Sequence, residues 1–67
     1  MLDNKAKVRL FHNNYIIKRE VYENLTYYYK HSKSGGSWDT ERVKATQFYT
    51  AKEASDIAIK LNKEIHG

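Results

Sequence analysis

The sequence predicts an α+β fold, in which an antiparallel sheet packs against one C-terminal helix. The sheet has three strands, and a short fourth strand is an alternative. Three observations lead to this prediction. Residues 5–12 alternate between polar and apolar side chains, an Asn-Asn pair follows them, and apolar residues recur at helical spacing near the C-terminus. A length of 67 residues fits one β-β-β-α domain over residues 1–67.

The first hairpin is predicted from residues that alternate between two faces. Its inward side chains are those of Ala6, Val8 and Leu10. Asparagine tolerates positive φ, so Asn13-Asn14 is predicted as a two-residue turn, with the strand returning over residues 15–23. The resulting register pairs Leu10 with Ile17 inside and Arg9 with Lys18 outside.

Arg19 is the one side chain that does not suit this register, because it falls on the inner face. Either its aliphatic stem snorkels at the sheet edge or a bulge resets the strand.

Residues 27–30 predict a third strand after a turn over residues 23–26. A two-residue turn places Arg19 beside Lys30, whereas a three-residue turn places Glu20 there. The second alternative pairs opposite charges across the strands and is preferred. In that register Tyr27 and Tyr29 point inward, and Tyr28 and Lys30 point outward.

The segment that follows contains glycine and polar residues, and His31 to Ser37 are expected to form an exposed loop. Trp38 to Phe48 carries mixed signals, which favour a short edge strand with a turn over a second helix.

A capping box, Thr50 with Glu53, predicts the start of the helix. Its core-facing stripe is predicted to contain Ala51, Ala54, Ile57, Ala58, Leu61 and Ile65. Ile59 falls outside the stripe and Gly67 supplies a stop.

No residue pattern predicts catalysis, and the protein is expected not to be an enzyme. Its three histidines lack close spacing and cysteine partners, so neither a metal site nor a cofactor is expected. The serines at 32, 34 and 37 lack a nucleophile elbow, and no phosphate loop is present, which argues against a small-molecule substrate. Without a membrane-spanning or secretory segment, a cytoplasmic location and no membrane partner are expected.

Charge distribution points to binding. The chain has a formal charge of +4, and all of this excess lies in residues 1–50, with nine Lys/Arg against five Asp/Glu. If the helix covers the inner face, a basic and aromatic outer face remains, which suits nucleic acid, with DNA favoured over RNA. The predicted contacts are Lys7, Arg9, Lys18, Tyr22, Tyr28, Lys30 and Lys33. The two tyrosines stack on bases, and Lys33 acts with the backbone of Gly35-Gly36.

The segment Phe48-Tyr49-Thr50-Ala51-Lys52-Glu53-Ala54, after short basic strands, resembles the arm-type DNA-binding domain of phage and transposon tyrosine recombinases. It also looks like small accessory proteins encoded by phages and prophages of Gram-positive bacteria. The first resemblance implies that the sheet enters the major groove of DNA. The second implies a location in the host cytoplasm.

The same resemblance implies an alternative function, in which a phage protein inhibits a host defence or replication protein stoichiometrically, as anti-CRISPR factors do. Exposed aromatic residues suit such protein interfaces. The residues expected to contact a host protein are Trp38, Tyr22, Tyr28 and Ile59.

Overall fold

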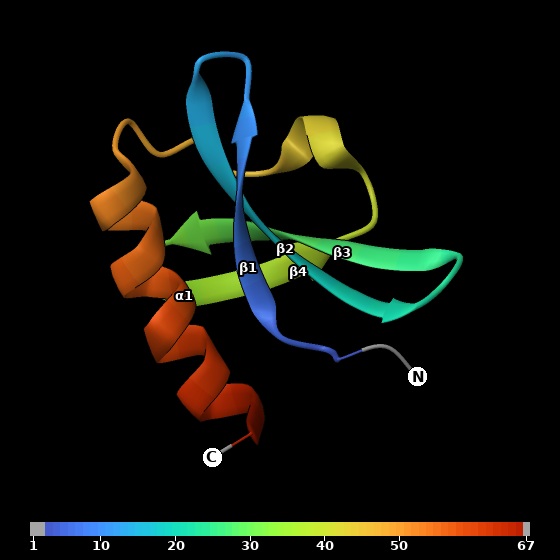
Figure 1. Cartoon of the computed structure of the whole chain (residues 1–67). Helices are drawn as coiled ribbons and strands as arrows, with labels where there is room; N and C mark the ends of the chain where they lie inside the picture. The colour runs from blue at the N-terminus through green and yellow to red at the C-terminus, as the bar shows by residue number, and fades with distance from the viewer. Residues whose placement is uncertain (1–2, 67) are drawn as a thin grey trace.

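The computed structural model describes residues 3–66 and contains one antiparallel sheet, with its strands in chain order, and one C-terminal helix (Figure 1). The elements are β1 (Ala6–Phe11), β2 (Asn14–Tyr22), β3 (Leu25–Ser32), β4 (Gly35–Asp39), the 3₁₀ turn η1 (Arg42–Lys44) and α1 (Ala51–His66). The predicted α+β fold is confirmed, and the short fourth strand is present.

The first hairpin turns one residue earlier than predicted, at His12-Asn13, where both residues have positive φ (48° and 66°). Arg9 therefore lies opposite Ile16, and the predicted pairs Leu10–Ile17 and Arg9–Lys18 are wrong. The register differs by two residues, and a shift of two returns every side chain to the same face. The predicted faces are consequently unchanged from Ala6 to Phe11 and from Asn14 to Glu20, although Leu10, predicted as an inward side chain, is 70% exposed at the end of the hairpin.

A β-bulge at Val21, between Glu20 and Tyr22, sets the register of β3. Lys18 pairs with Tyr28 and Arg19 with Tyr27, so the predicted pairing of Glu20 with Lys30 is wrong. The chain turns at Glu23-Asn24, and the bulge leaves one residue of β2 without a partner in β3. Neither of the two turns considered from the sequence included such a bulge. The predicted directions of the β3 side chains nevertheless agree with the observed register, with Tyr27 and Tyr29 on the inner face and Tyr28 and Lys30 on the outer face.

Arg19 remains on the inner face, as the alternating pattern predicts. Its guanidinium lies over the rings of Tyr27 and Trp38, 5.3 and 4.6 Å from their centroids. Cation–π stacking therefore accommodates the charge, and the bulge begins only after this residue.

The predicted loop over residues 31–37 is wrong, because β3 continues to Ser32 and turns tightly at Lys33-Ser34 into β4. The Ser32 hydroxyl donates to the carbonyl of Gly35 across the turn (2.9 Å). The Tyr29 ring lies directly on Gly36, at the position that a Cβ atom would occupy. Gly36 thus permits the close packing of Tyr29 on β4, whereas Gly35 beside the turn has a positive φ of 125°.

The helix begins as predicted, with the Thr50 hydroxyl accepting a hydrogen bond from the Glu53 backbone N–H (3.1 Å). It packs on β1 and β2, alongside which it runs in Figure 1. Its buried residues are Ala54, Ala58 and Leu61, which join Ala6, Ile17, Tyr29 and Phe48 in the core. Ile59 is exposed as predicted, whereas Ala51 is also exposed and does not belong to the buried stripe.

A short segment, residues 45–48, fills a fork where β2 and β3 separate. The Thr46 N–H donates to the Tyr29 carbonyl (2.9 Å), and Phe48 exchanges two backbone hydrogen bonds with Tyr15 (2.9 and 2.7 Å). Residues 38–48 therefore do not form one edge strand. Of these residues, only Trp38 and Asp39 belong to β4, and Phe48 forms an isolated β-bridge with Tyr15.

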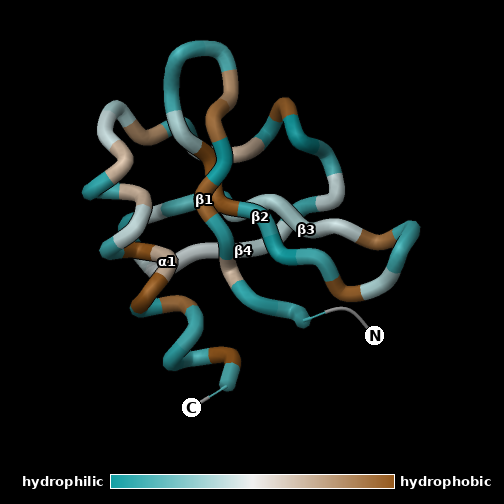
Figure 2. Tube along the Cα trace, viewed as in Figure 1, coloured by the Kyte–Doolittle hydropathy of each residue, from teal (hydrophilic) through white to brown (hydrophobic). Residues whose placement is uncertain are grey.

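The outer face is not bare, contrary to the prediction. Ile16 points to this face, yet it is only 2% exposed and lies outside the main core cluster. The η1 region covers it, with the Arg42 guanidinium 5.1 Å from the centroid of the Phe11 ring. Figure 2 shows the apolar parts of β1 and β2 at the centre of the molecule and a hydrophilic turn between them.

Candidate nucleic-acid interface

A hollow of about 210 Å³ opens on the outer face of the sheet, between β1, β2, β3 and η1. Its lining combines cationic, aromatic and aliphatic side chains. They belong to Arg9, Leu10, Phe11, Ile16, Lys18, Tyr28 and Arg42.

The register of the sheet brings the basic residues of β1 and β2 together. Lys7, Lys18, Tyr28 and Asp39 form one row across all four strands, and Arg9 lies two residue pairs further along the first hairpin, on the same face. Positive charge is thus concentrated at the β1–β2 side of the row, and its β4 end carries a carboxylate.

The two arginines of the hollow differ from the lysine in their charge partners. Lys18 forms an ion pair with Glu20 (3.3 Å). Within residues 3–66, Arg9 and Arg42 have no carboxylate at ion-pair distance. Arg9 donates one hydrogen bond to the Val8 carbonyl (2.8 Å), which leaves most of its donors available for an anion.

The rings of the hollow are held differently from one another. Phe11 has Arg42 over one face and the His12 ring in an edge contact, with centroids 4.2 Å apart. Tyr28 has no ring or guanidinium stacked on it among the residues that the structure describes. Tyr28 is therefore the ring best placed to stack against a flat group in the hollow.

Three residues predicted from the sequence line the hollow, namely Arg9, Lys18 and Tyr28. Lys7 lies opposite Lys18 but forms an ion pair with Asp3 (2.7 Å). The hydrogen bond from Lys7, and after it one from the Lys5 backbone, holds the pKa of the Asp3 carboxyl below its usual value. Lys7 is consequently less available to a phosphate than the arginines are.

The other predicted contacts lie elsewhere. Lys30 is on the outer face of β3 but not in the lining of the hollow. The bulge pairs Tyr22 with Leu25, which turns it toward the face of Tyr27 and away from the outer face. Lys33 occupies the β3–β4 turn. Gly35 and Gly36, whose backbone is predicted to bind a phosphate together with Lys33 in a loop, belong instead to β4.

Sequence reasoning did not identify Arg42 as a site residue. It follows β4 by three positions, and its place over Phe11 depends on how residues 45–48 fill the fork. No local pattern in the sequence signals this contact.

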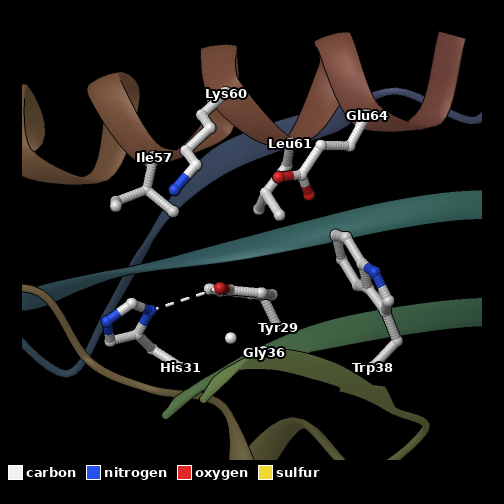
Figure 3. Close-up of a pocket in the computed structure, with 9 residues that line it drawn as sticks. Tyr29, His31, Gly36, Trp38, Ile57, Lys60, Leu61 and Glu64 are labelled. Carbon is white, nitrogen blue, oxygen red and sulfur yellow. Dashed lines mark hydrogen bonds between the residues drawn. The ribbon is translucent and has the colours of Figure 1, made fainter. Parts of the chain in front are cut away.

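A second cleft, of about 130 Å³, lies between α1 and the β3–β4 pair (Figure 3). Tyr29, His31 and Trp38 contribute from the sheet, and Ile57, Lys60 and Glu64 from the helix. The Tyr29 hydroxyl is within hydrogen-bond distance of His31 Nδ1 (3.2 Å). Burial, and to a smaller extent the charge of Glu64, raises the pKa of Tyr29, so this phenol stays protonated.

No group of metal-binding side chains occurs within residues 3–66, and no helix of this part of the chain is long and apolar enough to cross a membrane. No protein-family model matches the chain, and neither the curated proteins nor the solved structures compared with it include a match.

Proposed function

We propose that this protein binds single-stranded nucleic acid through the hollow on its outer face. The observation that supports this most directly is the pair of arginines without acidic partners, Arg9 and Arg42, beside the unstacked ring of Tyr28. Guanidinium groups bind phosphate oxygens in bidentate fashion, and aromatic rings stack on bases. Both kinds of group converge on one concavity.

The shape of the site favours a single strand over a duplex. A base offers its flat face to a protein ring only when it is unstacked, whereas a duplex presents base edges in a groove. The cationic residues surround a hollow that is also lined by Leu10, Phe11 and Tyr28, whose side chains suit contact with the flat face of a base. This differs from the major-groove binding that the recombinase resemblance implies. The preference for DNA over RNA stays a prediction.

Inhibition of a host protein is not favoured by a specific observation. Tyr28 and Trp38 lie on opposite faces of the sheet, because Trp38 pairs with Tyr29. Ile59 is on the exposed side of the helix. The residues expected at that interface thus do not form one contact surface.

The test is fluorescence anisotropy with a labelled 12-nucleotide single strand and the matching duplex, measured across a salt series. The logarithm of affinity should fall by about 0.7 per phosphate contact for each unit of log salt concentration. Arg9→Gln and Arg42→Gln should each reduce this slope by about that amount. The duplex should bind more weakly than the single strand at every salt concentration.

Two further variants sharpen the experiment. Tyr28→Leu should weaken binding by about 1–3 kcal/mol with an unchanged salt slope, because it removes stacking and no charge. Lys63→Gln removes the same charge as the arginine variants from an exposed helix position and should leave binding unchanged. Equal effects of Arg42→Gln and Lys63→Gln would reject the hollow as the site.

A further inference from the structure

The free edge of β4 carries unpaired backbone groups. In an antiparallel pair, successive residues alternate between bonding the neighbouring strand and pointing away from it. Gly35 flanks the two-residue turn and bonds Ser32, so Gly36 and Trp38 direct their N–H and C=O groups away from β3. No hydrogen bond from these groups occurs within residues 3–66.

The free edge of β1 is closed in part by side chains, although no hydrogen bond to the outward-pointing backbone groups of Leu10 occurs within residues 3–66. The Asn62 side chain accepts from the Ala6 N–H (2.7 Å) and donates to the Ala6 carbonyl (3.1 Å), which covers the β1 edge at Ala6. Arg9 covers the neighbouring Val8 carbonyl (2.8 Å). Residues 46–48 fill the fork between β2 and β3. The edge of β4 has neither such a cover nor a lysine or proline, which commonly protect edge strands.

The side chains of β4 are self-complementary about Ser37. If two copies of β4 pair antiparallel around a two-fold axis at Ser37, Gly36 of one copy faces Trp38 of the other. Each indole then meets a glycine instead of a second large ring. Both residues lie on the side of the cleft between α1 and β4, which Figure 3 shows with Trp38 at its edge.

Charge also favours a second copy as the occupant of this edge. In the same antiparallel arrangement, the turn that carries Lys33 lies beside Asp39 and Glu41 of the second copy. Lys33 has no ion-pair partner within residues 3–66. The cleft itself contains one lysine and one glutamate, Lys60 and Glu64, so it offers no excess charge to an acidic or a basic peptide.

We propose that two copies of this chain associate through β4 to form a continuous eight-stranded antiparallel sheet, in which Trp38 of each copy lies opposite Gly36 of the other. An isologous contact of this kind closes on itself and leaves no further β4 edge. The inference goes beyond the proposed function, because no residue of this contact lines the outer-face hollow.

The test is sedimentation equilibrium of the full chain without nucleic acid, over micromolar to millimolar concentrations. The wild-type protein should show a monomer–dimer equilibrium. Trp38 is the only tryptophan, so its fluorescence emission should shift to shorter wavelength as the dimer forms. A protein that remains monomeric throughout this range would overturn the proposal.

Ser37 provides a charge exchange that identifies the contact. The Ser37 side chains of the two copies face each other at the two-fold axis. Ser37→Lys and Ser37→Asp should therefore each place like charges opposite one another and weaken self-association about fivefold. An equimolar mixture of the two variants should associate more tightly than either alone, and Ser37→Ala should match the wild type. Circular dichroism checks that each variant folds. Variants that associate as the wild type does, or a mixture without recovery, would place the contact elsewhere.

Discussion

At the scale of single residues, Tyr29 combines packing with an ionisable group. Its ring is only 5% exposed, lies on Gly36 and contacts the Trp38 ring, with centroids 5.4 Å apart. Its hydroxyl reaches His31 in the cleft beside α1. One side chain therefore links the core, β4 and the cleft.

The raised pKa of Tyr29 predicts a loss of stability at alkaline pH. Burial disfavours the phenolate in the folded state, so unfolding becomes more favourable as pH rises above 10.0, the ordinary tyrosine value. Below that pH the contribution is fully present. Tyr29→Phe should show a smaller fall in the free energy of unfolding between about pH 9 and pH 11, measured by urea denaturation. Tyr49→Phe, at a site that is 82% exposed, is the control and should follow the wild type. A Tyr29→Phe protein with the wild-type pH dependence would contradict this explanation.

At the scale of elements, the start of α1 depends on one side chain. The Thr50 hydroxyl satisfies the Glu53 N–H, which has no partner inside the helix. Thr50→Ala should lower the free energy of unfolding by about 1 kcal/mol, whereas Thr50→Ser keeps the capping hydroxyl and should retain most of this contribution. Thermal and urea denaturation followed by circular dichroism measure both variants. Equal stability of the two would show that the cap contributes little.

The elements show what local sequence patterns determine and what they leave open. Alternation fixes the faces of the first hairpin as far as Glu20, where the bulge begins, but it cannot distinguish registers that differ by two, and so the partner of Arg9 predicted from the sequence is wrong. The sequence marks the start of the helix because the hydrogen bond between the Thr50 hydroxyl and the Glu53 N–H is local. In contrast, Gly35-Gly36-Ser37 has no apolar alternation, and its strand forms because Tyr29 packs on Gly36. Arg42 joins the site only through long-range contacts of its segment.

At the scale of the whole molecule, residues 45–48 connect parts that the sequence separates. Thr46 bonds the backbone of Tyr29 in β3, and its hydroxyl accepts the His31 N–H (2.8 Å). Phe48 bonds β2 through Tyr15 and inserts its ring, only 5% exposed, into the core beneath α1. The segment thus joins both halves of the sheet and leads directly into the helix.

This connection predicts that Phe48→Ala is the most damaging single truncation outside the strands. Removing a buried phenylalanine ring costs about 3–5 kcal/mol, which is close to the whole net stability expected for a domain of this size. Most Phe48→Ala molecules should therefore be unfolded at 25 °C, as read from circular dichroism and from the emission of Trp38. Val43→Ala, at a 76% exposed position in η1, should melt as the wild type does. If Phe48→Ala instead unfolds cooperatively near the wild-type temperature, the two halves of the sheet hold together without this segment. The core would then rest on the direct packing of α1 against β1 and β2.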